Sequence, residues 1–302
     1  MSLSKEIKKK YNNNISNNTK LSNYSWFNLG GPAEYFFRPD NKNQLIDFLQ
    51  DNIRNNLKIT ILGAGSNTLI RDQGIKGVVI KLGKKFAEIS LIDKNTIKAG
   101  AATLDRKISN FAMENEISSL EFLSCIPGSI GGAVIMNSGC YGYDISHVLS
   151  SIDVIDILEC KEKEIFKEEI DFYYRGTSLP NHFIITSVNL KGEKGLSKEE
   201  IRLKQNDMVE KKKLSQPSQI KTCGSTFKNL SNKKKAWQII KESGCDKFSE
   251  GDAVISEKHC NFFVNNGNAK SADIEKLINK VKKTVSDKTG VDLELEIKIV
   301  GG

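Results

Sequence analysis

The chain has 302 residues, of which 38% are hydrophobic and 27% are charged, and its formal charge is +8. This composition excludes a disordered or membrane-embedded chain, and the length predicts about two domains. No apolar run approaches the ~20 residues of a membrane helix, and the Lys- and Asn-rich start lacks the apolar core of a secretory signal, so we expect a cytoplasmic protein that does not bind membranes.

In the N-terminal half, apolar spacing predicts helix and strand after a polar lead-in over residues 1–24. Leu45, Ile46 and Leu49 repeat at helical spacing, whereas short apolar runs bounded by turns indicate strands. Thr103 is predicted to cap the amphipathic helix that follows it. The other elements predicted here are a helix over 43–53 and strands over 58–62, 78–82 and 96–101.

The middle of the chain is expected to form a packed loop followed by strands. Residues 120–142 are rich in Gly, Ser and Ala, which predicts a loop with one short helical turn. Strands are predicted over 152–157 and 183–190. Ser197 and Glu200 form a capping box that begins a charged helix reaching about residue 213.

The C-terminal part completes a mixed α+β class. Alternating apolar and polar residues predict a final strand over 293–300. The remaining predicted elements are a loop over 215–224, helices over 236–243 and 271–288, a stop at Gly244, a cap at Gly290, and a strand over 261–265.

Glycines near residues 191–196 predict a domain boundary. We therefore expect an N-terminal domain over 25–192, made of two lobes split near residue 84, and a C-terminal domain over 196–302. Six cysteines are scattered without a CxxC pair or zinc-ligand spacing, which predicts packed free thiols and no metal.

The first glycine loop, Gly63-Ala64-Gly65-Ser66-Asn67, follows a predicted strand. Small residues let backbone N–H groups approach a phosphate closely. Position 68 is Thr, so the loop lacks the third glycine of a Rossmann fingerprint, and the chain has no P-loop motif. Seen alone, a loop of this kind is more often a structural turn than a phosphate site.

The second glycine loop runs from Ile126 to Ala133 and continues to Asn137. So many small residues indicate that something bulky lies against the backbone; close packing of two chain segments is the alternative. Two loops of this kind in one chain favour a diphosphate cofactor.

Ordered motifs from about residue 24 to the end resemble the UDP-N-acetylenolpyruvoylglucosamine reductase family, in its shorter form. The motifs are Gly30-Gly31-Pro32-Ala33, the 63–67 loop with Leu69 and Asp72, Ile126–Asn137, Tyr174-Arg175, Gln216-Pro217, Cys223–Asn229, Ser256–His259 with Asn261-Phe262, and Leu293–Gly301.

The resemblance implies a vanillyl-alcohol-oxidase (PCMH) type of FAD-binding fold, with two lobes around non-covalent FAD, a C-terminal α+β domain for the UDP-sugar, and NADPH as hydride donor. Hydride would pass through the flavin to the enolpyruvyl double bond of UDP-N-acetylglucosamine enolpyruvate, giving the peptidoglycan precursor UDP-N-acetylmuramate. The expected cofactor contacts are Gly63, Ala64, Gly65, Ser66, Asn67, Thr68, Pro127, Gly128, Ser129, Gly131, Gly132, Ala133 and Asn137.

The implied reaction builds up charge on a carboxylate and needs a proton for the adjacent carbon. Arg175 suits the carboxylate, because a guanidinium binds it bidentately; a salt bridge is the alternative. By resemblance Ser225 is the proton donor and Glu296 helps polarise the carboxylate, which requires Glu296 to be protonated or bridged by Arg175. Glu294 projects to the same face of the predicted strand and is the alternative candidate for the role of Glu296.

Tyr174, Lys228 and Asn229 are the expected substrate contacts. For His259 and Asn261, a structural role is at least an equal alternative to substrate contact. The rival functions are another FAD-dependent oxidase of the same fold, which would use oxygen, and a basic nucleic-acid-binding module. The lysine clusters lack the interleaved aromatics of such a module. We expect a monomer with small-molecule substrates and no nucleic-acid partner.

Overall fold

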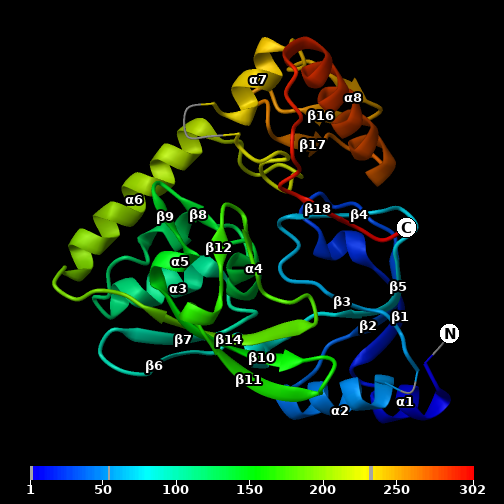
Figure 1. The fold of residues 1–302 in the computed structure, drawn as a ribbon, viewed down its shortest axis with the longest axis vertical. Helices are drawn as coiled ribbons and strands as arrows, with labels where there is room; N and C mark the ends of the chain where they lie inside the picture. Colours follow the sequence, from blue (N-terminus) through cyan, green and yellow to red (C-terminus); the bar gives the residue numbers. More distant parts are fainter. Residues whose placement is uncertain (1–2, 54, 231–233) are drawn as a thin grey trace. The chain divides into compact units, whose positions relative to one another are not determined.

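The structure is a computed structural model that describes residues 3–53, 55–230 and 234–302, and these residues form two compact units (Figure 1). Unit 1 comprises the chain up to Ser16, Phe36–Ala64 and Gly77–Lys212, and unit 2 comprises Asn17–Tyr35, Gly65–Lys76 and Lys213–Gly302. Each unit is built from three separate segments of the chain, whereas the predicted domains, 25–192 and 196–302, are each continuous in sequence. The predicted domain boundaries therefore stay predictions.

Unit 1 is built on an antiparallel sheet of order β11-β10-β14-β7-β6. In Figure 1 the helices α3, α4 and α5 lie on one side of this sheet. The bounds are β6 Ile89–Leu91, β7 Thr96–Gly100, β10 Leu149–Asp156, β11 Lys161–Phe166, β14 Phe183–Lys191, α3 Asp105–Glu114, α4 Ile130–Ile135 and α5 Ile145–Val148.

Alternation along the sheet separates an apolar face from a polar one, because successive residues of a strand point to opposite faces. Ile152, Val154 and Val188 are buried in a core that also receives Ile108 and Ala112 of α3. The predicted strands over 96–101, 152–157 and 183–190 are therefore confirmed within a few residues at their ends.

Two short hairpins and the helix α6 complete this part of unit 1. The bounds are β8 Gly139–Cys140 with β9 Tyr143–Asp144, β12 Phe172–Tyr173 with β13 Gly176–Thr177, and α6 Lys198–Ser215, whose last three residues belong to unit 2. The predicted capping box is confirmed: the backbone N–H of Ser197 donates to Glu200 Oε2 at 2.8 Å, and that of Glu200 donates to Ser197 Oγ at 3.3 Å.

The N-terminal segment contains elements that the sequence did not predict. Helix α1 (Lys5–Lys10) is capped by Ser4, and Tyr11 packs edge-on against Phe37 and Phe48, at ring-centroid distances of 5.6 and 5.4 Å. These aromatic partners lie far along the sequence, so local polarity does not reveal the packing. The elements nearby are α2 Lys42–Ile53, β1 Ile15–Lys20, β2 Pro32–Phe37, β3 Ile59–Ile61 and β5 Ile75–Ile80, with sheet order β1-β2-β5-β3.

In unit 2, helix α8 packs against a small antiparallel sheet of order β15-β16-β17, and helix α7 contacts α8 (Figure 1). Its core contains Phe227, Phe263, Leu277 and Ile278, all nearly or fully buried. The bounds are β4 Thr68–Ile70, α7 Ala236–Glu242, β15 Ser249–Glu250, β16 Ala253–Ile255, β17 Phe263–Asn265, α8 Ser271–Thr289 and β18 Lys298–Val300, which runs parallel to β4.

Two helix caps and the final strand were predicted from the sequence, with different outcomes. Gly290 caps α8 with a φ of 67°, as predicted. The predicted cap at Thr103 is wrong, because the N-cap of α3 is Leu104, and the Thr103 hydroxyl caps nothing. The strand predicted over 293–300 is regular only in β18, because residues 294–296 pair with a short extended segment through a single isolated bridge, Phe227 with Leu295.

All six cysteines are free and five are buried, which confirms the prediction of packed thiols. Within the described parts of the chain, we find no helix that is both long and apolar enough to cross a membrane.

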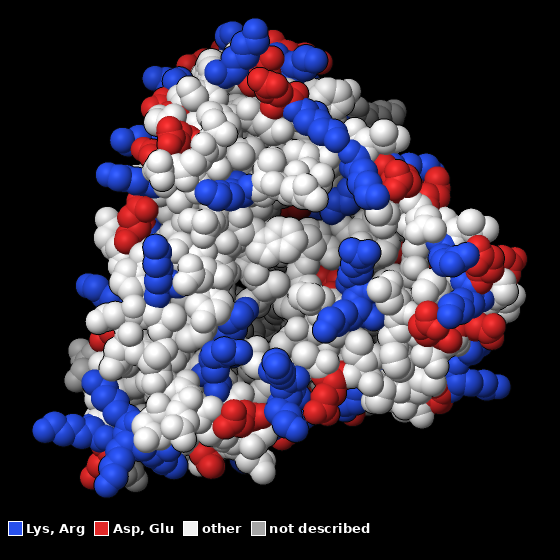
Figure 2. Space-filling model, turned by 180° about the vertical axis from the view of Figure 1, so that it is seen from behind, with Lys and Arg blue, Asp and Glu red and all other residues white. Residues whose placement is uncertain are grey.

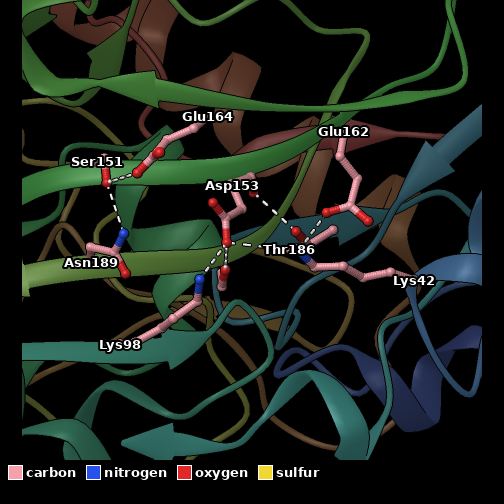
Figure 3. Close-up of polar contacts among 9 residues, drawn as sticks. Lys42, Lys98, Ser151, Asp153, Glu162, Glu164, Thr186 and Asn189 are labelled. Atoms are coloured by element: carbon pink, nitrogen blue, oxygen red, sulfur yellow. Dashed lines mark hydrogen bonds and ion pairs between the residues drawn. The ribbon is translucent and has the colours of Figure 1, made fainter. Parts of the chain in front are cut away.

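The polar face of the large sheet carries a charge network centred on Asp153 (Figure 3). The Asp153 carboxylate accepts from Lys98 Nζ at 2.7 Å and from Ser187 Oγ at 2.5 Å, and Lys42 Nζ lies 3.7 Å away. Thr186 Oγ1 donates to the Asp153 carbonyl at 3.1 Å. Lys42 comes from α2, so the network joins α2 to strands β7, β10 and β14.

Replacing Asp153 by alanine should lower the free energy of unfolding by about 1.5–3 kcal/mol at neutral pH, the usual worth of hydrogen bonds to a charged group. Burial raises the pKa of Asp153, but the bonds from Lys98 and Ser187 outweigh it, so the pKa lies below its ordinary value. The contribution is therefore complete above pH ~4 and is lost as the pH falls through the folded-state pKa. Urea unfolding at neutral and acid pH measures it.

The matched control is alanine at Asp292, an exposed carboxylate. Equal losses of stability in the two variants, or a loss at Asp153 that persists at acid pH, would contradict the assignment.

Candidate active site

In unit 1, the beginning of the first glycine loop lies against the second. A Cβ atom added to Gly63 would be 3.2 Å from Ser129 Oγ. The carbonyl of Gly63 accepts a 2.5 Å hydrogen bond from Lys81 Nζ, and burial lowers the pKa of that lysine. The two predicted loops thus come together beside an ammonium group, which suits a phosphate-bearing ligand. Sequence reasoning missed Lys81, since it lies 18 residues after Gly63.

The second loop is held by backbone hydrogen bonds to the segment before α3. The N–H groups of Ile130 and Gly131 donate to the carbonyls of Thr103 and Ala101 at 2.9 and 3.0 Å. A Cβ on Gly131 would come within 2.9 Å of the Ala101 Cβ, so only glycine allows this approach. These two amides are thus used within the chain, and Gly131 serves the packing of the loop.

Gly132 differs from its neighbour. A Cβ added there would meet only Ser129 Oγ, at 3.9 Å, and would otherwise point into open space. A glycine with nothing packed against it leaves room for a ligand at the start of α4.

Buried polar atoms without partners lie on the segment that holds this loop. Within the described part of the chain, Thr103 Oγ1 and both carboxyl oxygens of Asp105 are buried and have no hydrogen-bond partner. Burial raises the pKa of Asp105 well above its ordinary value, which favours the neutral acid. Asp105 lies three residues before Ile108 on the buried helical face, a spacing that the sequence already shows.

This surrounding fits a bulky polar cofactor: it has a close-packed glycine, an open glycine, a nearby ammonium and orphaned buried polar atoms. Such atoms call for a bound group or water, because unsatisfied buried polar groups are costly.

Asn137, a predicted cofactor contact, makes its own connections within unit 1. It is buried with a φ of 39°, Ser146 N–H donates to its Oδ1 at 3.1 Å, and its Nδ2 donates to the Tyr173 carbonyl at 3.3 Å. Asn137 thereby ties the end of α4 to the β12–β13 hairpin.

Tyr174 and Arg175 form the two-residue turn of that hairpin, since Tyr173 pairs with Gly176. Arg175 has a φ of 61°, in the left-handed region that usually needs glycine. Its Nη2 donates to the Gly139 carbonyl at 3.2 Å, and its guanidinium lies 4.9 Å from the centre of the Tyr174 ring. A non-glycine residue that is held in this strained conformation and carries a charged side chain is typical of functional sites.

The rest of the hairpin explains why it keeps this shape. The Tyr173 ring lies over Gly176, where a Cβ would come within 2.1 Å of a ring carbon, and the Tyr173 hydroxyl donates to the Thr177 carbonyl at 2.5 Å. The turn that carries Arg175 is therefore fixed by its neighbours.

In unit 2, Ser225 and Glu296 lie on neighbouring extended segments. The backbone N–H of Glu296 donates to the Thr226 carbonyl at 2.8 Å, and the N–H of Lys228 donates to the Glu294 carbonyl at 2.8 Å. The residue directly after Ser225 is thus bonded to Glu296. Sequence motifs 70 residues apart are brought together by this pairing.

The later part of the first glycine loop belongs to unit 2 and adjoins the same segments. Asn67 Nδ2 donates to the Glu296 carbonyl at 3.0 Å, and the Lys298 N–H donates to the Asn67 carbonyl at 2.9 Å. The thiol of Cys223, two residues before Ser225, donates to the Thr68 carbonyl at 3.4 Å. Asn67, predicted as a cofactor contact, therefore also holds the backbone of Glu296.

Glu294 and Glu296 differ in their surroundings. The side chain of Glu294 is 73% exposed and forms a 2.5 Å ion pair with Lys228 Nζ, whereas Glu296 is half-buried. Asn229 Oδ1 accepts from the Ala236 N–H at 3.1 Å, at the start of α7. His259 Nδ1 accepts from the Asn261 N–H at 3.3 Å, which matches the structural alternative for this histidine.

The predicted site residues thus fall into two groups. Unit 1 holds the residues 63–64 and 127–137, Tyr174 and Arg175. Unit 2 holds the residues 65–68, Ser225, Lys228, Asn229 and Glu296.

Two family models match separate parts of the chain. An FAD binding domain matches residues 33–158, and the C-terminal domain of UDP-N-acetylenolpyruvoylglucosamine reductase matches residues 216–300. The reductase of that name from Pelagibacter ubique is 46% identical over 97% of this chain and 98% of its own, and that of Orientia tsutsugamushi (strain Ikeda) is 43% identical over 97% and 96%.

A solved structure with the same name, from Thermus caldophilus, superposes with a TM-score of 0.81 at 30% identity, covering 95% of this chain and 98% of that one. Together with the match to an FAD binding domain, this confirms the predicted α+β FAD-binding fold.

Proposed function

Since the chain belongs to the UDP-N-acetylenolpyruvoylglucosamine reductase family, we propose that Arg175, Ser225 and Glu296 carry its reaction. The protein is an NADPH-dependent flavoprotein oxidoreductase that reduces the enolpyruvyl double bond of UDP-N-acetylglucosamine enolpyruvate. When bound, FAD would supply the hydride chemistry that links NADPH to the terminal carbon of that double bond. The residue roles that follow are our proposal.

The residues that would hold FAD are those of the two glycine loops. Gly132 leaves room for a ligand, Lys81 supplies positive charge, and Thr103 and Asp105 carry buried polar atoms that lack partners in the described chain. Charge and close backbone approach are what a diphosphate needs.

Arg175 would bind the substrate carboxylate, on which charge develops as hydride arrives. A guanidinium stays protonated and offers two parallel N–H donors, so it stabilises the developing enolate. Glu296 would share this environment; with Arg175 bridging the two carboxylates, or with Glu296 protonated, their repulsion is removed. Tyr174 packs on the guanidinium and would orient it.

Ser225 would donate its hydroxyl proton to the carbon next to the carboxylate, and water would then restore the serine. The observation that carries this proposal is the 2.8 Å bond from the Glu296 N–H to the Thr226 carbonyl, which joins the segments of the proposed donor and the proposed acid. An alcohol is a weak acid, so its positioning is decisive.

An anaerobic two-step experiment tests the function. NADPH should bleach the flavin of the purified protein, and the UDP-enolpyruvyl sugar should restore the oxidised spectrum while UDP-N-acetylmuramate appears by mass spectrometry. Reoxidation by oxygen alone, with no sugar product, would favour the rival oxidase. A colourless protein that cannot be reconstituted with FAD would refute both.

The nucleic-acid alternative requires a basic stripe with interleaved aromatic side chains. On the one face that Figure 2 shows, Lys and Arg side chains are spread over the whole face, and acidic side chains lie beside several of them. We also propose that the protein is a monomer. We propose a cytoplasmic location, since its substrates are soluble nucleotides. Analytical ultracentrifugation tests the monomer, and a dimer at micromolar concentration would contradict it.

Glutamine at Glu294 should strengthen substrate binding, because Lys228, a proposed substrate contact, is held by this carboxylate in a 2.5 Å ion pair. An exposed ion pair is worth up to about 1 kcal/mol, so KM for the sugar should fall by up to about fivefold, with kcat unchanged. Steady-state kinetics measure both constants.

The matched control is glutamine at Glu250, which forms an exposed pair with Lys280 in the same unit. It should leave KM unchanged. A KM that rises in the Glu294 variant would mean that Glu294 itself contacts the substrate.

A further inference from the structure

The side chain of Asn261 is bonded twice to one residue of the Ser225 segment. The Phe227 N–H donates to Asn261 Oδ1 at 2.9 Å, and Asn261 Nδ2 donates to the Phe227 carbonyl at 2.8 Å. Asn261 is only 2% exposed, so both bonds lie away from solvent. One carboxamide therefore satisfies both backbone groups of Phe227, as a neighbouring strand would.

The backbone of the same region adds to this clamp. The Thr226 N–H donates to the Asn261 carbonyl at 2.8 Å, and Ser225 forms an isolated bridge with Phe262. On the other edge, the Glu296 N–H bonds to the Thr226 carbonyl. The segment 225–227 is thus held from both sides.

Before Ser225 the chain is anchored at Cys223, which is buried and whose thiol donates to the Thr68 carbonyl at 3.4 Å, but it is open at Gly224. Gly224 has a φ of 79°, and a Cβ added there would meet nothing within 4 Å. After Ser225, the Phe227 ring is fully buried and packs against Phe263 at a centroid distance of 5.8 Å. Holding Phe227 in place holds Ser225 in place.

We propose that Asn261 is a positioning residue for the proton transfer made by Ser225: its carboxamide fixes the register of residues 225–227, and with it the position of the serine hydroxyl. The inference rests on the proposed role of Ser225. Misplacing a reacting group by about 1 Å costs about 10²-fold in rate, so a residue two positions away that sets the register controls this step.

The chemistry of the clamp suggests a selective variant. A carboxamide has one donor and one acceptor in fixed geometry, whereas an ionised aspartate only accepts. In Asn261→Asp the bond from the Phe227 N–H survives, but a carboxylate oxygen faces the Phe227 carbonyl. When the carboxyl group is protonated, its O–H donates to that carbonyl, and the clamp is restored.

The test measures the two half-reactions separately in the FAD-loaded protein. Asn261→Asp should keep NADPH-driven flavin reduction within about threefold of the wild type and slow sugar-driven reoxidation by about 10²-fold at high pH. As the pH falls, protonation should bring the reoxidation rate back toward that of the wild type. Burial raises the pKa of the new carboxyl group and so moves this recovery toward neutral pH.

Other titrating groups near the clamp are common to both proteins. His259, whose pKa is lowered by burial, lies beside Asn261, and Lys228, Glu294 and Glu296 belong to the paired segments. The rate ratio of variant to wild type at each pH therefore isolates the introduced carboxyl group.

The matched control is Asn265→Asp. Asn265 is also buried in unit 2, where its side chain bonds to the Phe27 carbonyl and to the N–H groups of Gly267 and Ala269, away from the Ser225 segment. It should lower thermal stability without separating the half-reactions, and without recovery of the reoxidation rate at low pH. Thermal unfolding of each variant is recorded at each pH.

Asn261→Ala supplies a second variant, since it removes both bonds and introduces no charge; it should slow reoxidation by about 10²-fold at every pH. Asn261 variants whose half-reactions slow equally, or an Asp variant without pH-dependent recovery, would overturn the inference alone. A wild-type protein that the sugar does not reoxidise would overturn the function, and with it the role of Ser225 on which the inference rests.

Discussion

Alanine at Ser225 is expected to leave NADPH-driven flavin reduction intact and to slow reduction of the enolpyruvyl sugar by about 10²–10⁴-fold, the usual contribution of general acid catalysis. The hydroxyl is the proposed source of the proton that quenches the carbanion, whereas hydride transfer from NADPH needs no proton from this residue. Anaerobic stopped-flow absorbance of the flavin separates the two half-reactions.

The fold should survive this substitution. Ser225 is half-buried at the end of a segment that is held by backbone bonds of Thr226 and by the buried ring of Phe227, and neither support involves the serine hydroxyl. Alanine at Ser249, an exposed residue of β15, is the control and should leave both half-reactions unchanged. Unchanged sugar turnover in the Ser225 variant would refute its role as proton donor.

Glycine at Arg175 should lower the rate of sugar reduction by about 10²–10³-fold, the loss that follows removal of one preorganised donor to a developing charge. Glycine is the informative choice here because the φ of Arg175 is 61°, a conformation that glycine adopts without strain. The turn therefore keeps its shape, and the measured loss reports the guanidinium itself.

Two comparisons make this result specific. Lysine at Arg175 keeps the charge but loses the bidentate geometry, so it should recover only part of the rate. Alanine at Arg202, an exposed residue of α6 paired with Glu199, should have no effect. A defect confined to flavin reduction by NADPH would contradict the proposed contact of Arg175 with the substrate carboxylate.

Much of the fold follows from local pattern. Apolar residues at helical spacing predict α2 and α8, and Ser197 with Glu200 predicts the start of α6, because hydrophobic periodicity and capping act over a few residues. The glycine loops were likewise visible as compositions that permit close backbone approach. The family resemblance rested on short motifs in a fixed order, which a single sequence displays in full.

The order of the chain could not show which segments become neighbours. Helix α8 illustrates this: the backbone N–H groups of Ser271 and Ala272 at its start donate to the carboxylate of Asp72, 199 and 200 residues earlier. The Asp153 network similarly joins residues of β7, β10, β14 and α2, and its charge pairing depends on strand register rather than on local sequence.

The sequence by itself determined the family of the protein and the helices and strands with strong periodicity, and it is the source of the proposed site residues. Tertiary structure alone decided that Gly131 serves packing while Gly132 leaves open space, that Glu294 pairs with Lys228, and that Asn261 clamps Phe227. The physical reason is that a residue's type fixes what it can donate, accept or bury, whereas its partners are fixed only when distant segments pack and every buried polar group must find a neighbour.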